Sequence, residues 1–380
     1  MDFHLSAEQI EIQQTVRKFA RNEIAPLAEE LDRDERFPLG LVKKMGEMGL
    51  LGLMIPEQYG GTGAGVVTSC VVGEEVSYAC ASAAFVYGAS AVLCAHNLAR
   101  NCSEEQKKKY LPALASGEKL GAMAMTEPDA GSDVLSMRTS AEKRDGEYIL
   151  NGTKTFITNG PIADIILVYA RTDKNAGPRG ISAFIVENAF PGFSVGKEFK
   201  KMGMRGSPTS ELFFEDCRVP AENLIGHENG GLKILMSGLD VERVLMGCLG
   251  VGIAQAAFDA SVKYAKERVQ FGQPLITFEM IGEMLANMST DIEAARLLTL
   301  KAAALCDEGV RATVEASHAK LFSAEAAMRT TTNAVQIHGG YGYMQEFGVE
   351  RLMRDAKILA IGGGTSQVQQ LIIMRELMKD

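Results

Sequence analysis

The sequence lacks the cysteine and histidine spacings that mark metal sites and disulfide frameworks. Its seven cysteines include no C-x-x-C pair, and its five histidines include no H-x-x-x-H pair. The absence of both spacings argues against structural zinc and against a disulfide-stabilised fold. We therefore expect no metal ion in the protein and a reducing compartment around it.

Long runs of one kind of residue are also missing. The basic stretch Lys107–Lys109 is short and the net charge is −9, so the composition argues against nucleic-acid binding. No uninterrupted apolar stretch reaches the length of a membrane span, and the N-terminus lacks the basic-then-apolar pattern of a secretion signal. We expect no membrane span, and a location in the cytoplasm of a bacterium or, for a processed eukaryotic protein, in the mitochondrial matrix.

The chain is long enough for several domains, and its character changes twice along the 380 residues. Residues 1–118 are predicted to form an N-terminal helical domain, because Ser6 and Gln9 have capping-box spacing and apolar residues follow at helical intervals. The glycine-rich stretch at 59–65 lies among these helices and follows no clear strand. It is therefore predicted to be a connecting loop rather than a nucleotide-binding turn.

Residues 119–228 are predicted to form a middle domain, built as a small antiparallel β barrel or sandwich. Asp145-Gly146 is a hairpin signal, and β-rich runs separated by turn residues follow it. Residues 229–380 return to long stretches rich in alanine, leucine and methionine, which predict a C-terminal helical bundle. The predicted fold class is therefore α+β, mainly α.

Five segments combine glycine with hydroxyl, aromatic or basic residues. They are AMTEPDAGSD (124–133), NGTKTFITNG (151–160), ERVQFGQPL (267–275), QIHGGYGY (336–343) and RDAKILAIGGGTSQ (354–367). Their glycine, hydroxyl, aromatic and guanidinium groups permit close backbone approach, hydrogen bonding, stacking and phosphate contact. Taken singly, each segment also has a structural interpretation: a β-turn for TEPDAGSD, a core side chain for Phe156 and a helix-end salt bridge for Arg268.

In this order, and over nearly the whole chain, the five segments resemble the acyl-CoA dehydrogenase family, and most closely its isovaleryl-CoA dehydrogenase branch. The resemblance implies a C-terminal bundle of four helices, FAD as cofactor, an acyl-CoA substrate, electron-transfer flavoprotein as electron acceptor and a homotetramer. The FAD-binding residues that it implies are Met125, Thr126, Ser132, Phe156, Thr158, Arg268, Gln270, Phe271, Gln336, Gly340, Thr365 and Gln367. Those between Arg268 and Gly340 are expected to reach the FAD of a neighbouring subunit. The substrate-binding residues that it implies are Ser132, Asp240, Arg243, Met246, Gly362 and Gly364.

The proton-abstracting base is where the sequence departs from the common family pattern. That pattern has an aromatic residue and a catalytic Glu where this chain has Gly362 and Gly363. In the isovaleryl branch the Glu stands on a different helix, directly before an Arg, and Glu242-Arg243 resembles that arrangement. The resemblance thus implies Glu242 as the base and the Gly363 N–H as a donor to the thioester carbonyl. A solvent-facing Glu242 is the structural alternative.

The function that the sequence favours is α,β-dehydrogenation of a short branched-chain acyl-CoA, with isovaleryl-CoA first. The two missing side chains at Gly362 and Gly363 are expected to leave volume for a branched acyl group. Burial beside that group is expected to raise the pKa of Glu242. Three alternatives remain open: another bulky or alicyclic acyl-CoA, a lyase-like activity in a flavoprotein of the same family, and a non-catalytic helical interaction protein.

Overall fold

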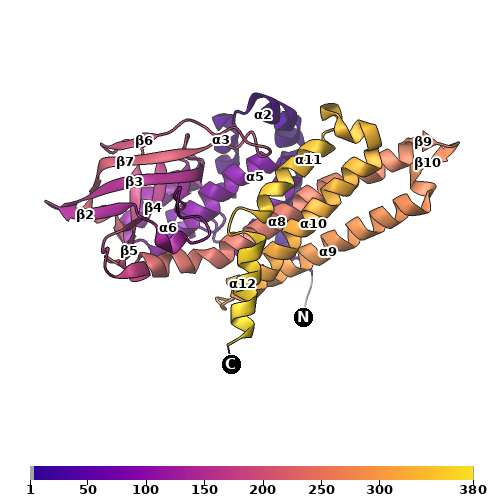
Figure 1. Ribbon diagram of the computed structural model, residues 1–380. Coiled ribbons are helices and arrows are strands. Elements are labelled where there is room, and N and C mark those ends of the chain that lie inside the picture. The colour runs from indigo at the N-terminus through magenta and orange to yellow at the C-terminus, as the bar shows by residue number, and fades with distance from the viewer. Residues whose placement is uncertain (1–3, 380) are drawn as a thin grey trace.

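The computed structural model describes residues 4–379, and its elements run from helices through a sheet to helices again (Figure 1). The N-terminal helices are α1 (Ala7–Phe19), α2 (Ala28–Asp34), α3 (Leu39–Glu47), α4 (Gly65–Ala79), α5 (Ala81–Gly88), α6 (Asn97–Asn101) and α7 (Glu104–Ala115). The strands of the middle sheet are β1 (Gly121–Ala124), β2 (Ser140–Arg144), β3 (Glu147–Thr158), β4 (Ile165–Arg171), β5 (Ile181–Glu187), β6 (Phe193–Val195), β7 (Thr209–Pro220) and β8 (Leu224–Ile225). The C-terminal elements are α8 (Gly231–Glu267), the short strands β9 (Val269–Gln270) and β10 (Gln273–Pro274), α9 (Glu279–Asp307), α10 (Thr313–His338), α11 (Val349–Ala356) and α12 (Ser366–Leu377). The predicted order of a mainly helical protein with a middle sheet is confirmed.

The capping signal at the N-terminus is confirmed. Ser6 Oγ accepts a hydrogen bond from the Gln9 N–H at 3.1 Å, and the Ser6 N–H donates to Gln9 Oε1 at 2.9 Å. These bonds satisfy backbone donors that the first turn of α1 leaves unpaired. The glycine-rich stretch at 59–65 is a loop up to the start of α4. There the Val66 N–H donates to the Asp307 carboxylate at 2.6 Å, which ties α4 to the end of α9.

The middle sheet is mixed rather than purely antiparallel. Its strands pair in the order β6-β7-β3-β2-β4-β5-β8, and β1 joins β4. β1 runs parallel to β4 with Gly121 opposite Ile165, and β2 also meets β4 in parallel where Ser140 lies opposite Arg171. The prediction of an antiparallel barrel or sandwich is wrong at these two pairings. β1 has only four residues, too few for its sequence to indicate a strand or its direction.

The hairpin predicted between β2 and β3 is present. Arg144 lies opposite Glu147 in antiparallel register, with Asp145 and Gly146 between them at φ angles of 48° and 83°. Positive φ at both central residues is what a type I′ turn requires, and Asp-Gly accepts it at low cost. The hairpin sets the register of β3, which carries Phe156 and Thr158 further along.

The 37-residue helix α8 runs from the sheet to the β9–β10 hairpin at the opposite end of the molecule (Figure 1). It packs against α4, α9 and α10, and α11 and α12 pack in turn on α10. Every residue from 241 to 254 is buried. Any functional side chain in this part of α8 therefore lies inside the protein, between the N-terminal and C-terminal helices.

Among residues 4–379, two helical stretches have the length and hydropathy of a membrane span, Ala81–Asn101 and Gly231–Glu267. In their most apolar windows, 83% and 72% of the residues are buried inside the protein. Helices that form a protein core pass the same test of length and composition. The two stretches are therefore only weak evidence for a membrane span.

Candidate active site

Glu242 lies on a buried face of α8, next to the triple-glycine loop that precedes α12. The residue is 8% exposed, so the alternative of a solvent-facing Glu242 is wrong. A Cβ atom placed on Gly363 would lie 3.6 Å from Oε1 of Glu242. The fold thus makes direct neighbours of the two residues predicted to carry the catalytic chemistry, although they are far apart in the sequence.

The electrostatic environment of Glu242 is that of a proton acceptor. Burial raises the pKa of its carboxyl above the usual value, while the positive charges of Arg243 and Lys320 act in the opposite direction. No group among residues 4–379 donates a hydrogen bond that lowers the pKa of this carboxyl. Its oxygens therefore remain available to take a proton from a bound substrate.

Met246, one turn further along α8, borders two of the glycines. A Cβ atom on Gly363 would lie 3.3 Å from Met246 Cγ, and one on Gly362 would lie 3.8 Å from Met246 Cε. The space beside Gly363 is therefore shared by Glu242 and Met246, and the space beside Gly362 is more open. Gly363 and Gly364 have φ angles of 62° and 82°, a backbone region that favours glycine, whereas Gly362 is not at positive φ. Only Gly362 lacks a backbone reason to be glycine.

Two side chains without a recognisable sequence motif, Lys320 and Gln369, hold the glycine loop. Lys320 on α10 donates a hydrogen bond from Nζ to the carbonyl oxygen of Gly364 at 2.5 Å. Gln369 on α12 donates from Nε2 to the carbonyl oxygens of Gly363 and Gly364 at 3.2 Å and 3.0 Å. A single lysine in an alanine-rich helix gives no sequence signal of such a contact, because the loop lies far away along the chain.

Thr365 and Gln367 follow the loop at the start of α12. The Thr365 hydroxyl accepts a hydrogen bond from the Val368 N–H at 3.2 Å, so it is the N-cap of this helix. Its own hydroxyl proton remains available to a ligand. Gln367 is exposed on the first turn of α12, and Ser132 is exposed in the segment between β1 and β2.

Asp240 and Arg243 line a cavity of about 750 Å³. Arg243 Nη1 donates to Asp240 Oδ1 at 2.9 Å, and Thr313 Oγ1 donates to Asp240 Oδ2 at 3.0 Å. The Nε of Arg243 is buried and has no hydrogen-bond partner in the described part of the chain. The other charged residues lining this cavity are the basic Arg100, Lys233, Arg311, Arg375 and Lys379 and the acidic Glu376. A mainly positive lining suits a ligand that carries phosphate groups.

The turn after β1 is held from within the sheet. Lys154, fully buried on β3, donates from Nζ to the Met125 carbonyl at 3.0 Å and to Glu127 Oε1 at 2.8 Å. The Thr155 N–H donates to the Thr126 carbonyl at 2.9 Å. Burial lowers the pKa of Lys154 to about 8, and Glu127 opposes that shift. Met125 and Thr126 therefore belong to a fixed turn, and no motif in the sequence marks the buried ion pair that fixes it.

Phe156 presents its ring to solvent from β3. The residue is 67% exposed, so its interpretation as a core side chain is wrong. It has a φ of 58° and lies at a register irregularity between Lys154 and Ile157, and its ring centroid lies 5.4 Å from that of Phe199. An irregularity of this kind redirects side chains relative to the regular alternation of a strand. Thr158, two residues further on, is half-buried at the end of β3.

The remaining predicted FAD contacts gather at the far end of α8, around the β9–β10 hairpin (Figure 1). The Arg268 guanidinium lies 5.5 Å from the centroid of the Tyr341 ring, a cation–π contact. Among residues 4–379, no acidic side chain forms an ion pair with Arg268, so the helix-end salt bridge is absent there. The other members of this group are all exposed: Gln270, Phe271, Gln336 and Gly340.

The predicted FAD-binding residues therefore fall into two groups with the chemistry that FAD requires. The sheet and the start of α12 offer an exposed aromatic ring at Phe156 and hydroxyl groups at Thr158 and Thr365. The far end of α8 offers the Arg268 guanidinium, which suits a pyrophosphate. A single chain keeps the β9–β10 hairpin away from the sheet (Figure 1).

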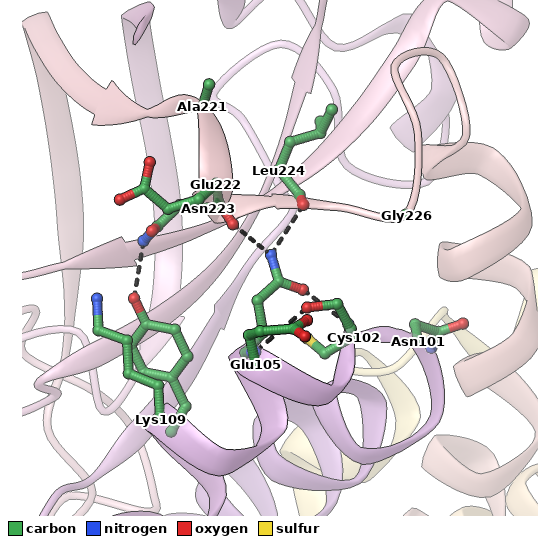
Figure 2. Close-up of a pocket in the computed structure, with 12 residues that line it drawn as sticks. Asn101, Cys102, Glu105, Lys109, Ala221, Glu222, Asn223, Leu224 and Gly226 are labelled. Atoms are coloured by element: carbon green, nitrogen blue, oxygen red, sulfur yellow. Dashed lines mark hydrogen bonds between the residues drawn. The ribbon is translucent and has the colours of Figure 1, made fainter. Parts of the chain in front are cut away.

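A second cavity, of about 560 Å³, lies between α7 and the segment at 221–226 (Figure 2). Gln106 Nε2 donates to the carbonyl oxygens of Glu222 and Leu224 at 2.6 Å and 2.9 Å, and Asn223 Nδ2 donates to the Tyr110 hydroxyl at 2.9 Å. These bonds fasten α7 to the end of the sheet, and none of the predicted site residues lines the cavity. The described residues, 4–379, contain no cluster of three His, Cys, Asp or Glu side chains suited to a metal ion.

Comparisons with known proteins identify the family of the chain. Three family models match the chain: the acyl-CoA dehydrogenase N-terminal domain over residues 6–118, the middle domain over 122–217 and the C-terminal domain over 229–378. The chain is 47% identical over 379 residues to a short-chain-specific acyl-CoA dehydrogenase of Clostridium acetobutylicum, with 100% of each chain covered. It is also 47% identical over 380 residues to a mitochondrial isovaleryl-CoA dehydrogenase of Pongo abelii, with 99% of this chain and 90% of that protein covered.

A solved structure of butyryl-CoA dehydrogenase from Megasphaera elsdenii has the same fold. The two structures agree with a TM-score of 0.98 at 43% sequence identity, and 100% of each chain is covered. The family resemblance inferred from the sequence motifs is thus confirmed. The chain belongs to the acyl-CoA dehydrogenase family, whose members are FAD-dependent oxidoreductases that act on CH–CH bonds.

Proposed function

We propose that the protein catalyses α,β-dehydrogenation of a short branched-chain acyl-CoA, with isovaleryl-CoA as the first substrate to test. The observation that carries this proposal is the position of Glu242, a buried carboxylate beside Gly363. Residues 362–364 are all glycine and supply no acid or base of their own. Glu242 supplies a carboxylate at this position from a different helix.

Glu242 and the Gly363 N–H have separate roles in the proposed reaction. Glu242 is the general base, which takes the α-proton of the substrate onto its carboxylate. The Gly363 N–H donates to the thioester carbonyl oxygen and stabilises the negative charge that grows there as the α-proton leaves. Burial raises the pKa of Glu242 toward the working pH, which strengthens it as a proton acceptor. The chemistry that FAD supplies when bound is acceptance of the hydride from the β-carbon.

The coenzyme A part of the substrate is assigned to the cavity lined by Asp240 and Arg243. Its positive side chains complement phosphate groups, and the unpartnered Nε of Arg243 offers a further donor. Asp240 is held by Arg243 and Thr313, so it fixes the guanidinium and the start of α10 relative to each other. Ser132, exposed before β2, is assigned to the CoA chain or the outer part of FAD.

The acyl group is assigned to the space beside Gly362 and Met246. A Cβ atom on Gly362 would meet no atom closer than 3.6 Å, so a substrate methyl group fits where the common aromatic side chain is missing. Gly364 belongs to the same loop and turns the chain toward α12. A second candidate is a dehydrogenase for another bulky or alicyclic acyl-CoA, because Met246 is a flexible side chain that can repack around a different acyl group.

The FAD site is assigned to two chains of a homotetramer. One chain supplies Met125, Thr126, Ser132, Phe156, Thr158, Thr365 and Gln367, and a neighbouring chain supplies Arg268, Gln270, Phe271, Gln336 and Gly340. The separation of these groups in a single chain supports this arrangement (Figure 1). Phe271, 93% exposed at the tip of the hairpin, also supports it, because an aromatic ring in that position favours burial by another chain. Electron-transfer flavoprotein is the proposed acceptor for the electrons.

The proposed subcellular location rests on the similar proteins. A bacterial protein of this family, as in Clostridium acetobutylicum, and a mitochondrial one, as in Pongo abelii, are equally similar to the chain. We therefore propose the cytoplasm of a bacterium or the mitochondrial matrix.

The experiment that tests the proposed function is an anaerobic titration of the purified, FAD-loaded protein. Isovaleryl-CoA, butyryl-CoA and an alicyclic acyl-CoA are added in turn, and bleaching of the flavin absorption is recorded. Bleaching with a preference for isovaleryl-CoA supports the proposal, and a preference for the alicyclic substrate favours the second candidate. Flavin that no acyl-CoA bleaches, although the substrate binds, would contradict dehydrogenation and favour a lyase-like activity.

A further inference from the structure

Lys320 is a buried cation in the first third of α10, beside the glycine loop of the candidate active site. The residue is 1% exposed, and its Nζ donates to the Gly364 carbonyl oxygen at 2.5 Å. Burying an ammonium group is unfavourable unless hydrogen bonds and nearby negative charge compensate it. One carbonyl oxygen is a partial compensation, so a second favourable interaction is required to explain why a lysine occupies this position.

Glu242 supplies that interaction. Burial lowers the pKa of Lys320 to about 8, Glu242 acts to raise it, and Arg243 acts in the same direction as burial. In return, the positive charge of Lys320 lowers the pKa of the Glu242 carboxyl. Lys320 on α10 contacts the loop at the Gly364 carbonyl, and Glu242 on α8 lies beside the next residue of that loop, where a Cβ atom on Gly363 would be 3.6 Å from its Oε1. The ammonium group and the carboxylate therefore stand at adjacent positions of the same loop.

Two further groups act on or respond to the charge of Glu242. Arg243 adjoins it on α8, but its guanidinium is bonded to Asp240 at 2.9 Å and lines the cavity described above. Tyr169 on β4 is fully buried, and its pKa is raised by burial and additionally by Glu242. Lys320 differs from both because it contacts the glycine loop directly.

We propose that Lys320 is a positioning residue for proton abstraction, whose ammonium group fixes the Gly364 carbonyl and places a positive charge beside the carboxylate of Glu242. This inference rests on the proposed function, since it assumes that Glu242 is the base. The hydrogen bond to Gly364 holds the loop that carries the Gly363 N–H. The charge makes the carboxylate available as a base at a lower pH than burial alone would permit.

The test is the pH profile of flavin reduction by isovaleryl-CoA in single-turnover experiments on the FAD-loaded protein between pH 5 and 9. The rate rises with pH as Glu242 ionises, so the midpoint of this rise reports its pKa in the reacting complex. In Lys320→Met, the positive charge is gone, so the midpoint is expected to move to higher pH by roughly one unit or more. The rate falls most at low pH and recovers as the pH increases.

Two more variants separate the charge from the hydrogen bond. Lys320→Gln keeps an N–H donor without the charge, and its profile is expected to move like that of Lys320→Met. Lys320→Arg keeps the charge, and its midpoint is expected to stay close to that of the parent protein. Arg329→Met is the matched control, because it removes a half-exposed cation from the same helix, where it pairs with Asp291 at 2.9 Å.

The outcomes distinguish this inference from the proposed function. A uniform loss of rate in Lys320→Met and Lys320→Gln, with the midpoint unchanged, overturns the inference because it shows a purely structural role. Loss of FAD from all three Lys320 variants but not from Arg329→Met also overturns it, since the residue is then required for folding. Failure of any acyl-CoA to reduce the flavin of the parent protein contradicts the proposed dehydrogenase activity itself.

Discussion

Glu242 and Gly363 are neighbours in the candidate active site, one in the first third of α8 and the other in the loop before α12. A Cβ atom on Gly363 would lie 3.6 Å from Glu242 Oε1 and 4.0 Å from Glu242 Cγ. A carboxylate that starts from either backbone position can therefore reach nearly the same point. This neighbourhood supports the proposal that Glu242 supplies the base in a chain without a glutamate at position 363.

The first prediction concerns the base. Glu242→Gln keeps the size of the side chain and removes its basicity, so FAD and acyl-CoA should still bind. The rate of flavin reduction should fall by roughly 10²- to 10⁴-fold, the usual contribution of a general base. The measurement is stopped-flow absorbance after mixing with isovaleryl-CoA. Glu325→Gln, an exposed position on α10, is the control and should behave as the parent protein does.

The pH dependence of the parent protein follows from the same carboxylate. Burial raises the pKa of Glu242 above its ordinary value, although Arg243 and Lys320 limit the shift. Only the ionised form is a base, so the rate should increase with pH through this raised pKa and not through the pKa of an ordinary glutamate. Glu242→Gln should lose this dependence. Full turnover in that variant would falsify the assignment of Glu242.

The second prediction moves the base to the other position. In the double variant Glu242→Gly, Gly363→Glu, part of the activity should return, because both positions face the same space. The recovery should be incomplete, since residue 363 has a φ of 62° and its Cβ would lie 3.3 Å from Met246 Cγ. Adding Met246→Ala removes this crowding and should raise the flavin-reduction rate further, a comparison that stopped-flow measurements can make directly.

The controls for this relocation are the single variants. Gly363→Glu alone, with Glu242 present, places two carboxylates close together and should bind acyl-CoA poorly. Glu242→Gly alone should be as slow as Glu242→Gln. If the triple variant is no faster than Glu242→Gly, the two positions do not serve the same α-carbon.

Much of the fold was predictable because its signals are local. The capping box at Ser6 and Gln9 and the Asp145-Gly146 turn each depend on residues next to one another, and both are present. The parallel pairing of β1 with β4 was not predictable, because a strand of four residues gains its direction from distant neighbours. The same limit applies to the hairpin of β9 and β10, whose strands have two residues each.

The candidate site was predictable only where a motif marked it. Family resemblance predicted the roles of Glu242 and Gly363, and the structure shows that the two residues are neighbours. Lys154 and Lys320, which hold the surrounding backbone, carry no motif of their own. Their role depends on burial and on a carbonyl partner far away in the chain. Neither property can be predicted from the residues next to them in the sequence.

The third prediction concerns the acyl pocket. Gly362→Tyr restores the kind of side chain common in the family, and Gly362 accepts a Cβ atom with only ordinary contacts, the nearest at 3.6 Å. The aromatic ring should occupy the space used by a branched acyl group. The ratio of kcat/KM for isovaleryl-CoA over butyryl-CoA should fall by roughly tenfold or more. Gly40→Tyr, in open space on α3, is the control, and an unchanged ratio in Gly362→Tyr would show that Gly362 does not line the pocket.

The last prediction concerns the two halves of the FAD site. Arg268→Ala removes a guanidinium proposed to contact FAD bound mainly to a neighbouring chain. Loss of one charged hydrogen-bonding partner costs about 1.5–3 kcal/mol, so FAD affinity should fall by roughly 10- to 100-fold. Flavin release on gel filtration measures this change. Arg144→Ala, which removes a half-exposed arginine of β2 from its ion pair with Glu142, is the control and should retain FAD.

Mixing variants shows whether the two halves come from different chains. Phe156→Ala damages the half at the sheet, and Arg268→Ala damages the half at the β9–β10 hairpin. When both variants are co-expressed, some sites combine an intact Phe156 from one chain with an intact Arg268 from the other, so FAD binding and flavin reduction should partly recover. If Phe156 and Arg268 served the same chain's FAD, every site in every mixture would carry one defect. No recovery in verified mixed oligomers would therefore contradict the proposed shared site, whatever the oligomeric state.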